Sequence, residues 1–463
     1  MGIEVGRLVI VSNRVAHPRA AATAGGLATG LIEALRGRGG VWVGWSGDVC
    51  SAGAAEPISL TSRDEVTFAT FPLPQVLLDR YYSGFANGTL WPLLHYFAAQ
   101  FRYDEAEYQA YRAANELFGK RLLSVLRDSD VVWIHDYHLI PLGQSLRQLG
   151  WRGPIGFFLH VPFPHFEVLR ALPVAADLLH ALLEYDLVGF QTPTDLSCFL
   201  GSVDAVLGRG AIAADGSIRA AGRTCHTGSF PIGVDVDGVG RTATQALALA
   251  PVQRMITGLH GRQLIIGVDR LDPTKGLLER FQGYRRFLEH GEAQSGRVTY
   301  LQIAPLGRQD VHSYAQIRDA LEQSAGRING RFAEADWTPI RYLNRNFPHT
   351  TLTGFLRAAQ VCLVTPIRDG MNLVSKEFIA AQDACDPGVL VLSDRAGSAG
   401  ELRQALIVNP YDTNGIARAL HQALEMPLEE RQERHEALLE SLRHNDIHRW
   451  HRDFVDRLVG VGR

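Results

Sequence analysis

The chain has 463 residues and a formal net charge of −3, with 46% hydrophobic and 21% charged residues. This length exceeds one ordinary hydrophobic core, so two domains are expected, and the composition is typical of globular proteins in water. A charge near zero gives no electrostatic basis for binding nucleic acid or anionic membranes.

The sequence also predicts neither export nor membrane insertion. No stretch approaches the roughly 18 to 20 apolar residues of a membrane span. The first residues, MGIEVGRLVIVSNR, contain too short an apolar run for a signal peptide and no cleavage site. Five cysteines without CxxC pairing or metal-ligand spacing are typical of a reducing compartment. We therefore expect a soluble, cytoplasmic protein.

Short apolar runs alternate with helical patterns in the first half of the chain. The runs are RLVIVSN, GVWVGWS, VVWIHD, IGFFLH and LVGFQT. Most are continuous rather than alternating, which is typical of strands buried on both faces of a parallel sheet. Helical patterns lie between them at 105–127 and 138–149.

A glycine-rich break, PIGVDVDGVG, is followed by a second series of runs: QLIIGV, RVTYLQIAP, VCLVTP, GVLVLS and ALIVNP. The two series predict an α/β protein with two doubly wound domains, 1–234 and 235–445.

The tail is expected to be helical over 428–460, with Trp450 and Phe454 as packing residues. We expect residues 446–463 to pack back on the N-terminal domain.

Four loop regions at the ends of predicted strands concentrate polar residues, and ligands of α/β proteins bind at the carboxyl ends of strands. The first, VSNRVAHPRAAATAGGL, contains Arg14 and the paired glycines Gly25 and Gly26 before a helix. Glycines let a backbone approach a ligand, and N–H groups at a helix start favour phosphate. The pattern is not GxGxxG, and a flexible turn is the alternative.

The second region combines WIHDYHL with FFLHVPFPH. His135, Asp136 and His138 resemble a metal motif, but alternate residues of a strand point to opposite faces, and no further His or Cys cluster completes a site. Asp136, at the strand end, is the better functional candidate. His160 ends the next strand, with a core histidine as the alternative.

The third loop, GVDRLDPTKGLLERF, places Arg270 and Lys275 after the first strand of the second domain. Two cations at a strand end that faces a helix start suit a diphosphate. A solvated loop is the alternative.

The fourth loop, TPIRDGMNLVSKEF, follows another apolar run. Asp369 could accept hydrogen bonds from hydroxyls, and the backbone from Gly370 to Asn372 offers N–H groups. The alternatives are that Asn372 is a helix N-cap and that Glu377 is a surface carboxylate. Together, the four regions favour a cleft for a sugar joined to a diphosphate.

A series of motifs in order over nearly the whole chain resembles one known family. The motifs are VSNR, AGGLATGL, GWSG, LWPLLHY, WIHDYHL, GFFLHVPFP, DRLDPTKG, QIAP, GRINGRF, LVTPIRDGMNLVSKEF, GVLVLS and VNPYD. They resemble the trehalose-6-phosphate synthases, retaining glycosyltransferases of family 20. The resemblance implies GT-B architecture, in which two Rossmann-like domains face a central cleft.

The resemblance implies transfer of glucose from a nucleotide-glucose, with UDP-glucose as the expected donor, to glucose 6-phosphate. The product would be α,α-trehalose 6-phosphate. No cofactor, metal, nucleic acid or membrane partner is implied, and we expect a homo-oligomer. A related class that uses glycerol 3-phosphate as acceptor and a non-catalytic sugar-phosphate sensor remain as alternatives.

The family's site residues transfer to matching positions of this chain. Catalytic roles are implied for Arg270, Lys275, Asp369, His160 and Asp136. Donor binding is implied for Gly25, Gly26, Arg270, Lys275, Phe347, Asp369, Gly370, Met371, Asn372, Leu373, Val374, Ser375, Lys376 and Glu377. Acceptor binding is implied for Arg14, Tyr82, Trp91, Asp136, Val161 and Arg308.

The chain departs little from the family pattern. DRLDPTKG has Pro-Thr where the family often has Tyr-Ser, and IAPLGRQDV is a variant around Arg308. Two other enzyme classes fit less well. A phosphorylase-like enzyme needs pyridoxal phosphate on a lysine, and a dehydrogenase needs a GxGxxG motif with a downstream acid, which this chain lacks.

Overall fold

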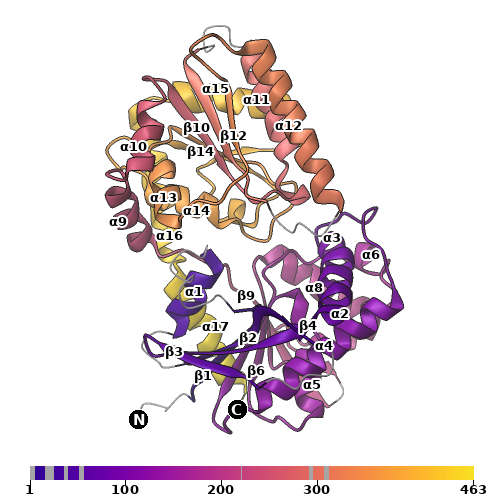
Figure 1. Cartoon of the computed structure of the whole chain (residues 1–463). Helices are drawn as coiled ribbons and strands as arrows, with labels where there is room; N and C mark the ends of the chain where they lie inside the picture. Colours follow the sequence, from indigo (N-terminus) through magenta and orange to yellow (C-terminus); the bar gives the residue numbers. More distant parts are fainter. Residues whose placement is uncertain are drawn as a thin grey trace. The chain divides into compact units, whose positions relative to one another are not determined.

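The computed structural model describes residues 6–15, 26–35, 40–51, 57–220, 222–290, 296–306 and 312–462. Figure 1 shows the chain, which divides into two compact units. Unit 1 comprises residues 1–231 and 448–463, and unit 2 comprises residues 232–447.

Unit 1 is built on one sheet with strand order β3-β4-β2-β1-β5-β6-β7-β9-β8 among the described residues. Neighbouring strands from β4 to β9 are parallel, and only β3 and β8 at the two edges are antiparallel. The strands are β1 (Leu8–Arg14), β2 (Gly40–Cys50), β3 (Ser59–Arg63), β4 (Val66–Pro74), β5 (Val131–His135), β6 (Ile155–Phe158), β7 (Leu187–Phe190), β8 (Ile218–Ala220) and β9 (Arg223–Ser229).

Unit 2 contains a parallel sheet with the order β12-β11-β10-β13-β14-β15. This is the strand order of a Rossmann sheet. The first three strands are added toward one edge of the sheet, and the next three are added on the other side of the first strand, toward the other edge. The strands are β10 (Gln263–Val268), β11 (Val298–Ile303), β12 (Ile340–Leu343), β13 (Val361–Val364), β14 (Val389–Ser393) and β15 (Leu406–Val408).

Helices connect the parallel strands in both units. Those of unit 1 include α1 (Gly26–Leu35), α2 (Gln75–Leu77), the π-helix η2 (Leu78–Leu90), α3 (Trp91–Leu94), α4 (Glu105–Leu123), the 3₁₀ turn η3 (Tyr137–Leu139), α5 (Leu142–Gln148), α6 (Phe166–Leu169), α7 (Ala175–Leu182), α8 (Pro193–Leu207) and α17 (Ile447–Val461). Those of unit 2 include α9 (Val236–Ala246), α10 (Ala250–Thr257), the 3₁₀ turn η5 (Pro273–Lys275), α11 (Leu277–His290), α12 (His312–Phe332), α13 (His349–Arg357), α14 (Leu373–Ala381), α15 (Thr413–Glu425) and α16 (Leu428–His444).

The ten apolar runs all form strands, which confirms the expected α/β fold with two doubly wound sheets. The edge strand β3 gave no signal because all of its residues are exposed and it therefore has no apolar pattern. The tail forms two helices rather than one, since α16 ends at its C-cap Asn445 and α17 follows directly.

Helices cover both faces of the unit 2 sheet. One face packs against α9, α13, α14 and α16 through a buried cluster that includes Phe355, Phe378 and Leu438. The other face packs against α11, α12 and α15 through a cluster that includes Phe281 and Leu321. Strands enclosed in this way need apolar residues on both faces, which explains the continuous apolar runs.

The C-terminal helix α17 belongs to unit 1, where it appears in yellow against the sheet (Figure 1). The ring of Phe454 in α17 stacks on Trp133 of β5, with centroids 4.6 Å apart. The ring of Trp450, also in α17, lies 4.9 Å from that of Trp133. A Cβ added at Gly156 or Gly189 would lie 2.7 Å from Phe454. The two glycines of β6 and β7 therefore make room for this helix.

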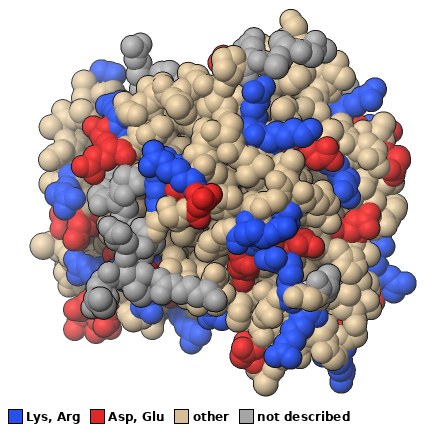
Figure 2. Space-filling view, turned by 90° about the horizontal axis from the view of Figure 1, so that it is seen from below, with Lys and Arg blue, Asp and Glu red and all other residues tan. Residues whose placement is uncertain are grey.

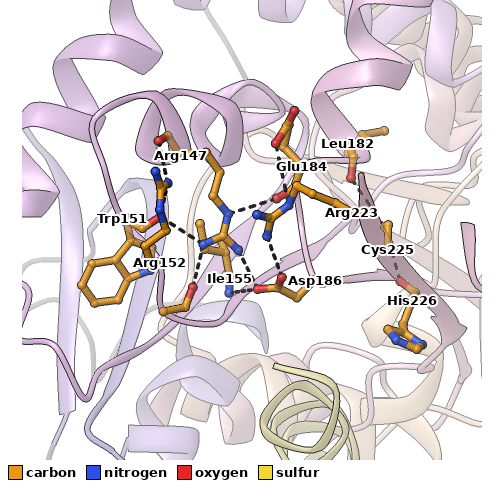
Figure 3. A network of polar contacts seen from close by, with 11 residues as sticks. Arg147, Trp151, Arg152, Ile155, Leu182, Glu184, Asp186, Arg223, Cys225 and His226 are labelled. Atoms are coloured by element: carbon orange, nitrogen blue, oxygen red, sulfur yellow. Dashed lines mark hydrogen bonds and ion pairs between the residues drawn. The ribbon is translucent and has the colours of Figure 1, made fainter. Parts of the chain in front are cut away.

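A polar network joins the first residues of neighbouring strands in the unit 1 sheet (Figure 3). It lies at the amino ends of these strands, opposite the carboxyl ends that carry the candidate loops. Asp186, just before β7, accepts hydrogen bonds from Arg147 at 2.7 Å, Arg223 at 3.0 Å and the amide of Ile155 at 2.8 Å. Burial lowers the pKa of the Arg147 guanidinium, and Asp186 opposes that effect. The network stabilises the sheet end remote from the strand-end loops.

Charged side chains are dispersed over the face shown in Figure 2. Lys and Arg side chains alternate with Asp and Glu side chains among uncharged residues, without one broad region of a single sign among the described residues in that view. None of the described helices combines the length and the apolar character that crossing a membrane requires.

Candidate active site

Each sheet places polar candidates at its switch point, where the strand order reverses. In unit 1, β1 and β5 are neighbours: Arg14 is the last residue of β1, and Asp136 directly follows β5. In unit 2, β10 and β13 are neighbours, and Arg270 and Asp369 lie in the loops after them. Ligands of open α/β sheets bind beside such points. The predicted residues therefore lie where the topology favours a site.

Asp136 has an unusual backbone, with a φ of 75° and a ψ of 162°. A non-glycine residue in this region is strained, and such strain is concentrated at functional sites. Its amide donates to the carbonyl of Phe158 at 2.8 Å, and its Oδ1 accepts from the amide of His160 at 3.3 Å. These bonds hold the carboxylate between the ends of β5 and β6.

A row of five aromatic rings connects the expected acceptor residues. Tyr82 lies 6.1 Å from Trp45 and stacks on His138 at 5.7 Å. His138 lies 4.0 Å from Tyr137, which lies 5.7 Å from Trp91. The row brings Tyr82 and Trp91, from different helical segments, beside the turn that follows the strained aspartate. Sequence reasoning did not identify Trp45 or a packing role for His138.

Arg14 is exposed at the end of β1, with its guanidinium carbon 5.3 Å from the ring centre of Trp45. A Cβ at Gly47 would lie 2.7 Å from the Nη2 of Arg14, and Gly47 has a φ of 97°. Glycine at this position therefore leaves the space that the guanidinium occupies. The structure places Arg14 at one end of the aromatic row.

His160 is half-buried, and the preceding strand residues are fully buried. Burial lowers the pKa of its imidazole to about 3, so the ring is neutral near pH 7. Val161, the next residue, is 7% exposed and belongs to the unit 1 core. In the described part of the chain, no three His, Cys, Asp or Glu side chains lie close enough together to share a metal ion.

In unit 2, the Nζ of Lys275 lies 2.5 Å from Oδ2 of Asp369. Burial favours the neutral amine, but the carboxylates of Asp369 and Asp269 more than offset it and raise the pKa of Lys275. The side-chain amide of Asn372 donates to the same Oδ2 at 3.0 Å. Lys275 is therefore a charged ammonium whose position is fixed by the loop after β13.

The backbone around Lys275 is held by close packing. Gly276 has a φ of 61°, and a Cβ there would lie 2.3 Å from the carbonyl oxygen of Thr365. Arg280, fully buried, lies 2.7 Å from Asp269 and donates to Thr365 at 2.9 Å and to the Lys275 carbonyl at 3.2 Å. Sequence reasoning missed Arg280, because a periodic pattern does not show that a helix arginine points inward.

Asn372 is the N-cap of α14, as the alternative interpretation predicted. Its φ is 73°, and its Oδ1 accepts from the amide of Ser375 at 3.0 Å. It also contacts Asp369, so the capping and the ligand roles are compatible. Gly370 lies against Gly397, where a Cβ would be 1.9 Å from the Gly370 carbonyl oxygen. Met371 is buried and accepts from the amide of Ser398 at 2.8 Å.

Two charged residues of α14 have opposite environments. Lys376 is fully buried, with Nζ 2.8 Å from the carbonyl of Ile232 and paired with Glu401. Its ammonium is therefore not available to a ligand. Glu377 accepts at 3.2 Å from Nε2 of His349 with its side chain 13% exposed, so it is not a surface carboxylate. Sequence reasoning missed His349.

Three of the remaining donor candidates pack against the same core cluster of unit 2. Leu373 and Val374 are partly buried against the core, as is Phe347. The ring of Phe347 packs on Phe355 at 5.3 Å, and Arg345 lies 4.4 Å above it. Arg270 is exposed, Gly26 is the first residue of α1, and Gly25 and Arg308 lie outside the described residues.

Comparison with known proteins covers nearly the whole chain. The model of glycosyltransferase family 20 matches residues 9–459. The trehalose-6-phosphate synthase of Enterobacter sp. (strain 638) is 44% identical over 454 residues, which are 97% of this chain and 94% of that protein.

Two similar solved structures contain ligands. An α,α-trehalose-phosphate synthase (UDP-forming) from Burkholderia xenovorans, in complex with glucose 6-phosphate, is 48% identical with a TM-score of 0.94, covering 98% of this chain and 100% of that one. A trehalose-6-phosphate protein from E. coli bound with UDP-2-fluoro glucose is 44% identical with a TM-score of 0.92, covering 98% of both chains.

Proposed function

Because this chain belongs to glycosyltransferase family 20, we propose that it transfers glucose from a nucleotide-glucose to glucose 6-phosphate. UDP-glucose is the expected donor, and the products are α,α-trehalose 6-phosphate and the nucleoside diphosphate. The observation that supports this function best is the charged Lys275–Asp369 pair beside Arg270 at the switch point of unit 2. The ligands of the two similar structures support the choice of substrates.

In the proposed reaction, the bond between the anomeric carbon and the diphosphate oxygen breaks as a hydroxyl oxygen of the acceptor bonds to the same carbon. The hydroxyl proton passes to the departing diphosphate on the same face, so the anomeric configuration is retained. Negative charge develops on the diphosphate. Arg270, Lys275 and the positive amino end of α14 stabilise that charge as preorganised dipoles and cations.

The other residues divide between the two substrates. Asp369 and His160 bind hydroxyls of the transferred glucose, and Glu377 binds the ribose. Arg14 binds the acceptor phosphate, and Tyr82, Trp91, Asp136, Val161 and Arg308 complete the acceptor site. Support for this division comes from the aromatic row of unit 1, which groups Arg14, Tyr82 and Trp91.

A substrate panel tests the proposal. UDP-, ADP- and GDP-glucose are each incubated with glucose 6-phosphate, glycerol 3-phosphate or no acceptor, and products are identified by mass spectrometry and NMR. We expect an α,α-linked disaccharide phosphate only with glucose 6-phosphate. A product with glycerol 3-phosphate instead would assign the chain to the related synthase class, and no transfer with any pair would favour a sensor.

A further inference from the structure

His135 and His160 form a hydrogen-bonded pair behind the candidate site. Nδ1 of His135 lies 3.0 Å from Nε2 of His160, and their rings are stacked with centroids 5.2 Å apart. His135 ends β5 and is 1% exposed, whereas His160 follows β6 and is half-buried. His135 therefore lies on the core side of the pair, and only His160 reaches the accessible surface of unit 1.

The polar neighbours determine which nitrogen of each ring bears the proton. The side-chain Nε2 of Gln191 lies 3.4 Å from Nδ1 of His160. An amide nitrogen donates, so Nδ1 of His160 accepts, and the single proton of the neutral ring is on Nε2. That proton is donated to Nδ1 of His135. His135 consequently has its own proton on Nε2, which has no hydrogen-bond partner among the described residues.

Burial keeps both rings neutral. It lowers the pKa of His160 to about 3 and that of His135 well below its ordinary value, with the neighbouring imidazole as a smaller cause for His135. Neither ring is protonated near pH 7. The pair is therefore a fixed hydrogen bond between two neutral imidazoles.

Aromatic side chains fix the orientation of the pair. Trp450 of α17 lies 6.0 Å from His160 and 6.2 Å from His135, and Trp133 lies 4.5 Å from His135. Phe158 lies 4.7 Å from His160. The rings leave His135 little freedom to rotate, so its acceptor nitrogen remains directed at His160.

We propose that His135 is a positioning residue that keeps the proton of His160 on Nε2, so that Nδ1 of His160 accepts from a hydroxyl of the transferred sugar when that hydroxyl replaces the long 3.4 Å contact of Gln191. The inference rests on the proposed function, because it assumes that His160 contacts that sugar. His135 itself does not touch the substrate. A neutral imidazole of unfixed tautomer would present an acceptor at Nδ1 only part of the time, so fixing it strengthens one hydroxyl contact.

Two variants and one control test the pair. His135→Leu removes the acceptor, and His135→Asn retains an oxygen close to the position of Nδ1. Trp133→Phe perturbs the same packing but leaves the histidine pair intact. Nitrogen NMR of the histidine rings should show His160 protonated at Nε2 in the wild type, in His135→Asn and in Trp133→Phe. In His135→Leu, part of the His160 signal should move to the Nδ1-protonated form.

The kinetic test uses UDP-glucose and its four monodeoxy analogues with glucose 6-phosphate. In the wild type, loss of one particular hydroxyl should lower kcat/KM for the donor by roughly tenfold, as loss of one hydrogen bond does. In His135→Leu, kcat/KM for UDP-glucose should fall by about the same factor relative to the wild type. In that variant, kcat/KM for the deoxy analogue should be only slightly lower than that for UDP-glucose. The KM for glucose 6-phosphate should not change.

Three results would overturn the inference. The first is an unchanged His160 tautomer in His135→Leu, and the second is that removing the donor hydroxyl lowers kcat/KM as much in that variant as in the wild type. The third is the same kinetic changes in Trp133→Phe. If His135→Leu does not fold, His135→Asn decides the question, since loss of the Nε2-protonated His160 signal in that variant contradicts the proposal. The NMR result does not depend on turnover. A chain that fails the substrate panel but keeps the NMR signature disproves the proposed function alone.

Discussion

The ammonium of Lys275 lies 2.5 Å from the carboxylate of Asp369, although 94 residues separate them in the chain. The contact joins the loop after β10 to the loop after β13. One residue of the pair is proposed to bind the diphosphate and the other the sugar. The ion pair therefore joins the residue proposed for the leaving group to the residue proposed for the transferred sugar.

Removing either cation of the donor site should slow turnover. We expect Lys275→Ala and Arg270→Ala each to lower kcat on the order of 10²-fold, because preorganised charge no longer stabilises the departing diphosphate. Lys120→Ala is the matched control, since that lysine is exposed on α4. Activity should also persist in excess chelator. If chelator abolishes activity and a divalent ion restores it, Lys275 and Arg270 alone do not stabilise the negative charge of the departing diphosphate.

Asp369→Asn should separate sugar binding from nucleotide binding. The amide keeps one oxygen that can accept from both Asn372 and Lys275, so the loop and the lysine should retain their positions, but the charged acceptor for hydroxyls is lost. We expect kcat/KM for UDP-glucose to fall while the Kd for free UDP, measured by calorimetry, stays near the wild-type value. Equal losses in the two measurements would indicate that the loop has collapsed.

Arg14→Ala should weaken binding of the acceptor without weakening binding of the donor. The guanidinium lies over Trp45 and is proposed to bind the phosphate of glucose 6-phosphate. Losing a charged hydrogen bond should raise the KM for glucose 6-phosphate by roughly tenfold or more and leave that for UDP-glucose unchanged.

We expect the same selective change in Arg308→Ala from the family resemblance. In both variants, the preference for glucose 6-phosphate over unphosphorylated glucose should narrow, because the lost contact recognises only the phosphate. Collapse of donor affinity with intact acceptor affinity would move the residue to the nucleotide site.

The pair of His349 and Glu377 should make stability depend on pH. The hydrogen bond to Glu377 raises the pKa of His349 above 6.5. A raised pKa means that the stabilisation is complete below about pH 6.5, the unfolded value, and is lost as pH rises through the folded value. The difference in denaturation midpoint between wild type and His349→Gln, measured without ligand, should therefore shrink with rising pH. A difference that grows with pH would contradict the pairing.

The Asp186 network should contribute to stability without affecting the reaction. Asp186→Ala leaves the buried Arg147 without its carboxylate, and breaking a buried pair typically costs about 3–5 kcal/mol. The denaturation midpoint should fall markedly, while kcat of the folded variant stays unchanged. Asp453→Ala, which breaks a more exposed pair with Arg449 on α17, should change the midpoint little. Similar effects of the two variants would rule out a special role for the network.

Much of the fold could be predicted from the sequence. Strands enclosed by helices on both faces require continuous apolar runs, so all ten runs are recognisable in the sequence alone. Polar residues close after those strands, such as Asp136 and Arg270, mark the strand ends. The strands β3, β4, β8, β9 and β12 and the break at Asn445 were not predicted. The strand β3 is exposed throughout, so it has no apolar pattern.

The sequence by itself determined which residue types stand at the strand ends and hence the kind of ligand that they suit. Only the tertiary structure decided which of them meet: Lys275 with Asp369, His135 with His160, and Arg14 with Trp45. The same holds for the inward direction of Arg280 and Lys376. The physical reason is that these contacts join parallel strands or their loops across long crossover connections. Their partners depend on sheet order and register, which no local pattern of side chains encodes.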